Sequence, residues 1–572
     1  MGRKKEERKR ICLSTVKERG WTDSLIKKYL PEPMLATNPV YHSSAKMKLW
    51  YEDVVIELES TIPEFAEAQA KKAERQLKRE QKIQELSENI NVRNPALDYT
   101  KAREMSRHFV LHVGDTNTGK TYESLQALKN AESGIYLAPL RLLAMEIQDK
   151  MLEDGVLCSM VTGEEENIVD GANLMSCTVE KLNINNTYEV GVIDECQMIA
   201  DRNRGGAWTR AILGLVAERI YLCMSPDAKD ICIKLIELCG DTYEVIEHKR
   251  DTELRFVGVI GEGGIRKNDA VILFSRKNVL WYAEKLKNKK GLKPSVIYGA
   301  LPYRARKEQV RKYINGETDI VVSTDAIGMG MNLPIKRVVF VETMKYNGLT
   351  TDLLEPNMVK QIAGRAGRRG MFDVGEVATF KQDHVIENGL TAAHGSIKKA
   401  YLPFPEELLN FSTEKLSRTM ANWREFKYPD MFHQQDVEFI VEKSKYLERT
   451  YKGLPVDIVF RLSMIMFDES NPILFGAWKH HVHCLMNGYE SNMPSPNEWD
   501  DLYQLELIHK KIGLFYSFHK TMGLEFDYDE LMKQKEKTVN LINKLLLEEY
   551  NKKNQKKKVK RDKYFDDFHY FF

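Results

Sequence analysis

The chain has 572 residues, of which 43% are hydrophobic and 29% charged. This much apolar material excludes a wholly disordered chain. No apolar run approaches the ~18 residues that cross a bilayer, so we expect no membrane-embedded domain. The 85 Lys and Arg nearly balance the 83 Asp and Glu, so any basic surface must come from local clustering. The eight cysteines form no paired framework, and no targeting signal is recognisable at the N-terminus, so we expect a cytoplasmic protein.

The pattern along the chain predicts two α/β lobes in tandem, with helical regions on both sides. Short β-rich runs alternate with helical patterns twice, which is typical of parallel sheets covered by helices. A polar stretch at 240–252 is the expected linker between the two blocks. The expected regions are a helical N-terminal segment (1–100), lobe 1 (101–245), lobe 2 (246–388), a helical C-terminal domain (389–550) and a basic, aromatic tail (551–572).

Eight runs are the clearest strand candidates. They lie near 108–113, 135–140, 190–194 and 220–224 in the first block, and near 270–274, 295–298, 320–323 and 338–342 in the second. The sequence predicts that ligands bind at the carboxyl ends of these strands, as they do in open α/β sheets.

The strongest motif is GDTNTGKT, which follows the first predicted strand and precedes a helical pattern. Its glycines allow backbone N–H groups to face phosphate oxygens, and the new helix adds positive partial charge. Lys120 is expected to reach the β- and γ-phosphates of a nucleotide, and Thr121 to ligate Mg²⁺. The expected nucleotide-binding residues of this loop are Gly114, Thr116, Asn117, Thr118, Gly119, Lys120 and Thr121.

Two adjacent carboxylates follow the apolar run at 190–193. A buried parallel strand places them at the carboxyl edge of the sheet, on the side of the glycine-rich loop. Asp194 suits association with Mg²⁺, and Glu195 suits the base that orients and deprotonates an attacking water. The acidic pair alone is weak evidence, but together with the loop it predicts nucleotide hydrolysis.

The second block ends in QIAGRAGRRG, at 361–370. Arg365 and Arg368 are three residues apart, so on a helix they would share a face and reach one phosphate together. Interleaved Gly and Ala residues permit a close approach. In a two-lobed nucleotide hydrolase these arginines are expected to close onto the γ-phosphate, and Gln361 to hold the water or that phosphate.

Together these motifs resemble those of the superfamily 2 helicases. The likeness is greatest to the mitochondrial degradosome RNA helicase family, named for the yeast suppressor-of-var protein, with its bacterial and viral relatives. It extends over residues 107–380, where further similar segments are YLAPLR at 136–141, TVE at 178–180, FSR at 274–276, VIYGALP at 296–302 and STDAIGMGMN at 323–332.

The resemblance implies two RecA-like lobes and an ATP-dependent helicase that moves 3′ to 5′ on RNA. It implies that Asp325 and Gly328 sense the nucleotide, and it suggests a nuclease partner by analogy. Residues implied to approach the nucleic-acid backbone are Pro139, Arg141, Thr178, Ser275, Gly299 and Thr324. A DNA helicase or translocase is the first alternative, because such motifs contact backbone more than bases. A nucleotide-gated binding protein that does not unwind is the second.

Two segments depart from the family pattern. The usual Ser-Ala-Thr is replaced by MSPD at 224–227, and no adenine-reading Gln segment precedes Val110. Loose nucleobase selectivity is therefore expected, so other nucleoside triphosphates should serve beside ATP.

Two weaker patterns leave alternatives open. His480, His481, His483 and Cys484 cluster near Trp478, but only His480 and Cys484 share a helical face, which favours ordinary packing over a metal site. The lysine-rich, aromatic tail at 551–572 is either a solvated end or a clamp that grips a strand by charge and stacking. The sequence does not indicate an oligomeric state.

Overall fold

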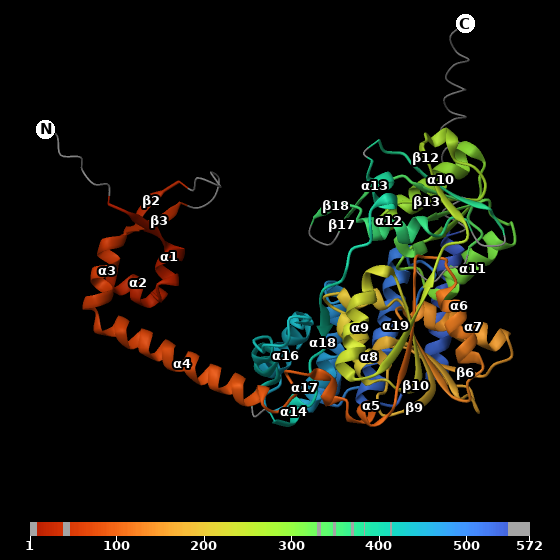
Figure 1. The fold of residues 1–572 in the computed structure, drawn as a ribbon. Helices are drawn as coiled ribbons and strands as arrows, with labels where there is room; N and C mark the ends of the chain where they lie inside the picture. The colour runs from red at the N-terminus through yellow and green to blue at the C-terminus, as the bar shows by residue number, and fades with distance from the viewer. Residues whose placement is uncertain are drawn as a thin grey trace, which may run out of the picture. The chain divides into compact units, whose positions relative to one another are not determined.

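The computed structural model describes residues 8–37, 46–328, 333–346, 350–367, 371–382, 384–411 and 414–546 (Figure 1). The chain divides into two compact units between Asn89 and Ile90. None of the described helices is both long and apolar enough to cross a membrane. The tail at 551–572 lies outside the described residues.

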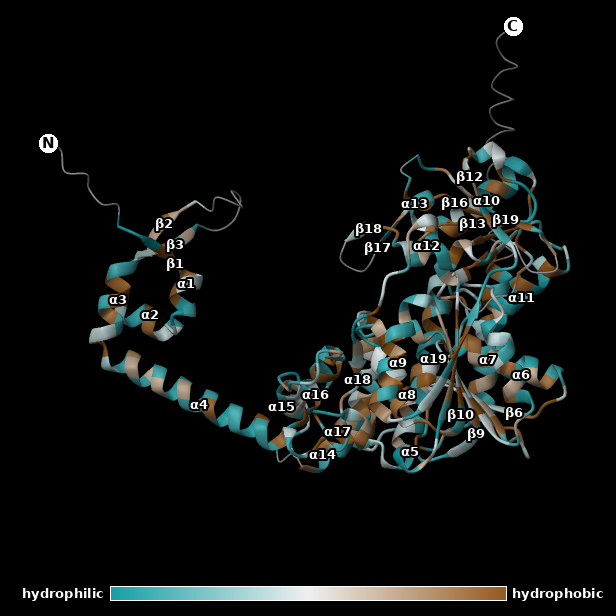
Figure 2. Cartoon of the chain, viewed as in Figure 1, coloured by the Kyte–Doolittle hydropathy of each residue, from teal (hydrophilic) through white to brown (hydrophobic). Residues whose placement is uncertain are grey.

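The first unit combines a small antiparallel sheet with helices. Its strands, in the order β1-β3-β2, are β1 (Arg10–Cys12), β2 (Met34–Ala36) and β3 (Met47–Tyr51). Its helices are α1 (Leu13–Glu18), α2 (Asp23–Tyr29), α3 (Glu52–Thr61) and α4 (Pro63–Ser87). The sequence predicted helices alone, because strands of three to five residues are too short to display a period. Helix α4 is mostly hydrophilic and buries only Phe65 and Leu86 (Figure 2).

The second unit begins with an eight-stranded sheet, which we call lobe 1 together with its helices. The strand order is β11-β4-β10-β9-β5-β8-β6-β7, and every neighbouring pair is parallel except β6 and β7. The strands are β4 (His108–Gly114), β5 (Gly134–Ala138), β6 (Cys158–Val161), β7 (Glu166–Asn167), β8 (Leu174–Thr178), β9 (Thr187–Ile193), β10 (Val216–Met224) and β11 (Thr242–His248).

Helices cover both faces of this sheet (Figure 1). On one face α8 (Gly205–Gly214) and α9 (Lys229–Cys239) pack their apolar side chains, and on the other α6 (Lys120–Lys129) and α7 (Arg141–Glu153) do so. A short helix, α5 (Thr100–Glu104), precedes the sheet. Because both faces are covered, the central strands read as continuous apolar runs.

One strand contradicts the sequence prediction. The polar stretch expected to be a linker contains β11, which pairs in parallel with β4 from Thr242 opposite His108 to His248 opposite Gly114. A strand at the edge of a sheet tolerates polar side chains because one side faces solvent. The connection to the next lobe is therefore confined to the few residues after His248.

Lobe 2 is built on a six-stranded, all-parallel sheet in the order β12-β19-β16-β13-β15-β14. Its strands are β12 (Glu253–Val259), β13 (Asp269–Ile272), β14 (Pro294–Ile297), β15 (Ile320–Ser323), β16 (Arg337–Phe340) and β19 (Val374–Thr379). Its helices are α10 (Arg276–Lys290), α11 (Tyr303–Ile314), α12 (Pro356–Ala363) and α13 (Val385–Thr391). A hairpin of β17 (Met344–Tyr346) and β18 (Thr351–Leu353) projects from it.

The C-terminal region is mainly helical, as expected, and contacts both lobes. It comprises β20 (Ala400–Leu402), α14 (Leu408–Phe411), α15 (Leu416–Trp423), β21 (Phe432–Gln434), α16 (Glu438–Thr450), α17 (Val456–Ser463), α18 (Pro472–Asn487), α19 (Leu502–Met522) and a helical stretch at 528–546. Glu506 of α19 accepts a 2.7 Å hydrogen bond from the Tyr298 hydroxyl in lobe 2. Lys535 donates a 2.8 Å hydrogen bond to the Glu164 carbonyl in lobe 1.

Candidate functional site

The glycine-rich loop joins β4 to α6, in the setting that the sequence predicted. Asn117 and Gly119 adopt left-handed backbone conformations, with φ of 65° and 91°. The Lys120 ammonium curls over the loop and donates to the carbonyls of Gly114 at 2.7 Å and Asp115 at 2.8 Å. Helix α6 begins at Lys120, so its N-terminal N–H groups and partial positive charge lie at the loop. The arrangement suits a phosphate group.

The acidic pair follows β9, which is separated from β4 by one strand, β10. Asp194 is buried, both of its oxygens lie 3.4 Å from the Thr121 hydroxyl, and the Tyr136 hydroxyl donates to it at 2.6 Å. Burial and, to a smaller extent, the neighbouring Glu195 charge together raise the pKa of Asp194 to about 6. Hydroxyl and carboxylate oxygens are the donors that Mg²⁺ prefers, so Thr121 and Asp194 fit such an ion.

Glu195 sits in a strained backbone conformation with φ of 52°, in the left-handed region. Gln197 donates a hydrogen bond from its side-chain amide to the Glu195 carboxylate. The carbonyl oxygen of that same amide accepts a 3.2 Å bond from the Ser225 backbone N–H. The carboxylate is thus held by a neighbour that is itself anchored at the end of β10.

Further hydrogen bonds connect Ser225 to lobe 2. Ser225 donates from its hydroxyl to Asp227, in the MSPD segment that departs from the family pattern. The other oxygen of Asp227 accepts a 3.1 Å bond from the side-chain amide of Asn357, on α12. A chain of hydrogen bonds therefore runs from Glu195 through Gln197, Ser225 and Asp227 to the second lobe. Sequence reasoning missed Asn357, because only the fold brings it to Asp227.

Arg365 lies in lobe 2 and is half-buried beside lobe 1. Its guanidinium donates to the Gly328 carbonyl, with a 3.1 Å bond from Nε. Burial lowers the pKa of Arg365, and the negative charges of Glu195, Glu146 and Asp194 oppose that shift. The predicted arginine therefore faces the acidic pair of lobe 1.

The helical spacing predicted for the two arginines is wrong. Helix α12 ends at Ala363, and Arg365 follows in a tight turn that ends at Gly367, where φ is 71°. A Cβ at Gly364 would lie 2.8 Å from the Thr116 Cβ, so glycine is needed for this turn to approach the loop. Arg368 lies outside the described residues. Gln361 is on α12 and lies beside Gly328. A Cβ built on Gly328 would lie 3.5 Å from the Gln361 Cγ.

A residue of the interlobe connection joins the glycine-rich loop to this turn. Arg250 donates to the Gly364 carbonyl at 2.9 Å, to the Ala366 carbonyl, and to the Thr116 carbonyl at 3.5 Å. The side-chain amide of Asn117 donates to the Gly367 carbonyl at 3.3 Å. Arg250 belongs to no sequence motif, so only the fold reveals that it joins the glycine-rich loop to this turn.

A cavity of about 360 Å³ lies beside these contacts. Apolar and charged side chains predominate around it, and its lining is Asp115, Thr116, Arg250, Leu254, Phe256, Lys360, Gly364, Glu387, Leu390 and Thr391. These lining residues include no Asn or Gln, the side chains that read a base edge with paired donor and acceptor. The cavity thus offers charged groups and threonine hydroxyls to a ligand, but no side-chain amide.

All six residues expected to approach nucleic acid lie at carboxyl ends of parallel strands. Pro139 and Arg141 follow β5, and Thr178 ends the adjacent β8. Ser275, Gly299 and Thr324 follow β13, β14 and β15, which are neighbours in lobe 2. Ser275 also caps α10, accepting from the Asn278 N–H at 3.1 Å.

The two edges are tied together by contacts between α7 and α11. Asp149 of α7 accepts a 2.7 Å bond from the Tyr303 hydroxyl and forms a 2.6 Å ion pair with Lys307.

Two residues of the predicted site form ion pairs within their own lobes. Arg141 pairs with Glu164 in lobe 1. Asp325, expected to sense nucleotide, forms a 2.6 Å ion pair with Lys345.

The weak metal pattern near Trp478 is not a cluster of converging ligands. His480 Nε2 lies 3.6 Å from Cys484 Sγ, and the part of the chain that the structure describes places no third His, Cys, Asp or Glu with them. A different group, His112, Glu123 and His248, does converge. Its members are far apart in sequence, and no spacing pattern could have found it.

Comparison with family models gives two matches. Residues 95–248 match the DEXQ-box helicase domain of Suv3, and residues 257–370 match the helicase conserved C-terminal domain. Among solved structures, the DUF1998 helicase MrfA bound to DNA and AMPPNP is similar with a TM-score of 0.40 and 16% identity, over 62% of this chain and 57% of that one.

Three curated relatives are more similar in sequence. The mitochondrial ATP-dependent RNA helicase SUV3 of Saccharomyces cerevisiae is 42% identical over 49% of this chain and 39% of its own length. The mitochondrial helicase DExH18 of Arabidopsis thaliana is 32% identical over 84% and 64%, and human mitochondrial SUPV3L1 is 34% identical over 74% and 58%. The chain thus spans less than two thirds of each of these relatives.

These relatives overturn one prediction. All three are mitochondrial by name, which contradicts the cytoplasmic protein that the sequence led us to expect. That expectation came from failing to recognise a targeting signal, and a signal that is not recognised carries no information about compartment.

The two matched segments adjoin one another in the chain. The first contains the whole eight-stranded sheet of lobe 1, and the second contains β13, β14, β15 and β16 of the lobe 2 sheet. Lobe 1 is thus similar to the DEXQ-box helicase domain of Suv3, and most of lobe 2 to the helicase conserved C-terminal domain.

Proposed function

We propose that the chain is an ATP-dependent RNA helicase that moves 3′ to 5′ by opening and closing its two lobes around a nucleotide. The observation that carries this proposal is the position of the half-buried Arg365 of lobe 2, on which the charges of Glu195 and Asp194 of lobe 1 act. Contacts with a γ-phosphate would favour the closed arrangement of the lobes, and hydrolysis would release it. The helicase names of the curated relatives support the substrate.

In the proposed reaction, Lys120 and the N-terminus of α6 bind the phosphates. Thr121 and Asp194 would hold Mg²⁺, which would help neutralise the negative charge of the phosphates. Glu195, held by Gln197, orients and deprotonates the attacking water. Arg365 stabilises the charge that develops on the γ-phosphate, together with Arg368, and Gln361 holds the water or the phosphate.

The remaining loop residues Gly114, Thr116, Asn117, Thr118 and Gly119 shape the phosphate cradle, and Asp325 with Gly328 senses its occupancy. The Arg365 guanidinium donates to the Gly328 carbonyl, which supports a sensing role for that segment. A strand of RNA would run along the carboxyl edges of both sheets. There it would contact Pro139, Arg141 and Thr178 in lobe 1, and Ser275, Gly299 and Thr324 in lobe 2. A nuclease partner is proposed only by analogy with the family.

The first prediction concerns unwinding itself. RNA duplexes with a 3′ tail should be separated when ATP and Mg²⁺ are present, and duplexes with a 5′ tail should not. Lys120→Ala should abolish separation and hydrolysis together, because the phosphates lose their main cation. A gel-based strand-displacement assay on matched RNA, DNA and hybrid duplexes measures this.

Two outcomes of that assay would contradict the proposal. Preferential separation of DNA duplexes would favour the alternative of a DNA helicase or translocase. Hydrolysis stimulated by RNA without any strand separation would favour a nucleotide-gated binding protein.

The second prediction concerns the link between the lobes. Asn357→Ala should lower RNA-stimulated hydrolysis about fivefold, because it removes a hydrogen bond to a carboxylate worth on the order of 1 kcal/mol. Asn357→Asp should lower it further, since it would place a second negative charge against Asp227. Nucleotide affinity, measured by fluorescence titration, should stay unchanged in both variants.

Asn388→Ala is the matched control, because it removes an exposed asparagine of the neighbouring helix α13. If Asn357→Ala hydrolyses ATP as fast as the control at saturating RNA, the hydrogen-bond chain does not couple the lobes.

The third prediction concerns nucleobase selectivity. ATP and GTP should be hydrolysed with kcat/KM values within about tenfold of each other, because the 360 Å³ cavity beside the loop lacks Asn and Gln side chains to read a base edge. Steady-state hydrolysis of the four nucleoside triphosphates measures this. Strict dependence on ATP would refute this view of the cavity.

A further inference from the structure

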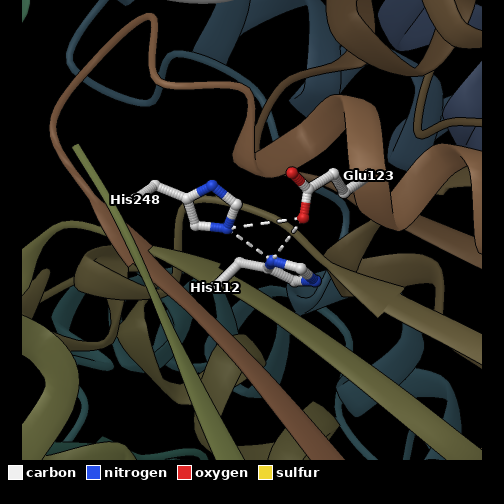
Figure 3. A group of neighbouring side chains, drawn as sticks. All are labelled: His112, Glu123 and His248. Carbon is white, nitrogen blue, oxygen red and sulfur yellow. Dashed lines mark hydrogen bonds and ion pairs between the residues drawn. The ribbon is translucent and has the colours of Figure 1, made fainter. Parts of the chain in front are cut away.

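Three side chains outside the proposed nucleotide site converge on one point at the edge of lobe 1 (Figure 3). His112 Nδ1 and His248 Nε2 face each other at 2.7 Å. A Glu123 carboxylate oxygen lies 3.6 Å from the first nitrogen and 3.8 Å from the second. In the part of the chain that the structure describes, these residues form the one group of three potential metal ligands that converge in this way.

The fold explains why these three side chains meet. His112 lies in β4, and His248 ends the neighbouring parallel strand β11, opposite Gly114. A Cβ at Gly114 would lie 2.9 Å from the His248 Cβ, so the missing side chain leaves room for His248 at this position. Glu123 is in the first turn of α6, directly after the glycine-rich loop. Each ligand thus comes from a different element.

The contacts within the group leave electron pairs directed at its centre. A hydrogen bond between two imidazole nitrogens requires that one of them carry no proton. The carboxylate oxygen is too far from either nitrogen for a hydrogen bond. His112 Nε2 is buried and has no hydrogen-bond partner among the described residues, so the polar contacts of the ring are made through Nδ1. Tyr221 stacks against the same ring, with centroids 5.9 Å apart, and helps fix its orientation.

We propose that His112, Glu123 and His248 form a binding site for a divalent transition-metal ion of the zinc class. Two imidazoles and a carboxylate are a ligand set that Zn²⁺ accepts, whereas Mg²⁺ and Ca²⁺ prefer oxygen alone. Tetrahedral Zn²⁺ with bonds of about 2.0–2.1 Å holds its ligand atoms about 3.3 Å apart. The two nitrogen–oxygen distances are within about half an ångström of this value. The two nitrogens must separate by about 0.6 Å from their 2.7 Å contact.

Exposure differs among the three ligands in a way that suits reversible binding. The side chains of His112 and His248 are 3% and 7% exposed, whereas that of Glu123 is 53% exposed. The ion would therefore enter past Glu123, and a water molecule would complete its coordination on that side.

Bound metal would connect three elements that surround the nucleotide loop. Strand β4 leads into the loop, α6 begins at Lys120, and β11 leads to Arg250, which contacts both Thr116 and the arginine turn of lobe 2. The ion should therefore raise the thermal stability of lobe 1. This inference rests on the ligand geometry and stands whether or not the chain unwinds RNA.

Zinc titration of the full, tag-free chain tests the proposal. The protein is first stripped by chelation, and Zn²⁺ is added in excess Mg²⁺ without nucleotide, with isothermal titration calorimetry as the readout. One equivalent should bind, and Co²⁺ in its place should give the visible absorption of four-coordinate cobalt. Glu123→Gln and His248→Ala should each weaken binding at least tenfold.

Glu123→Gln is the decisive variant, because the side chain is half exposed and its exchange leaves the core intact. A double variant, His480→Ala with Cys484→Ser, serves as the control. It removes the His480–Cys484 contact, which lies outside the proposed site, and should bind Zn²⁺ like the unaltered chain. The melting temperature should rise with Zn²⁺ in the unaltered chain but not in Glu123→Gln. Absence of binding, or binding that survives both Glu123→Gln and His248→Ala, would overturn the proposal.

Discussion

The position of the half-buried Arg365 guanidinium beside the carboxylates of lobe 1 is the interaction on which the rest of the structure depends. Removing a charged group from water costs several kcal/mol, and only opposite charges held in good geometry offset that cost. The charges of Glu195, Glu146 and Asp194 act on Arg365 from the other lobe. These charges favour an arrangement in which the two sheets meet at this place.

Several hydrogen bonds hold the two lobes together at this place. Arg250 bridges the glycine-rich loop and the arginine turn, and Asn357 reaches across to Asp227. The C-terminal helices contact both lobes, through Glu506 on one side and Lys535 on the other. In the proposed cycle, these groups would transmit a change at the nucleotide, because they have hydrogen-bond partners in each lobe. A proposed RNA strand would lie along the carboxyl edges of both sheets.

The sequence predicted those parts of the fold whose signal is local. A buried parallel strand is a continuous apolar run, so the runs that became β4 and β9 were recognisable, and the loop after β4 has a fixed spacing of Gly, Lys and Thr. Strand β11 was mistaken for a linker because an edge strand needs no apolar run. The helical spacing assumed for Arg365 failed because the helix ends at Ala363 and the chain turns at Gly367, where φ is positive.

The residues that sequence reasoning missed all depend on contacts between distant segments. Asn357, Arg250 and His248 belong to no short motif, and each gains its partner only when strands or lobes pack. The small sheet of the first unit was missed for a related reason, since strands of three residues have no detectable period.

Hydrolysis by Arg365→Ala, compared with its nucleotide affinity, tests the central claim most directly. If the lobes share one nucleotide, single-turnover hydrolysis at saturating RNA should fall roughly 10³-fold while the affinity for ATP changes little. Arg255→Ala, which removes an exposed arginine of the same lobe, should hydrolyse ATP normally. Hydrolysis by Arg365→Ala within about tenfold of that control would contradict a site completed by the second lobe.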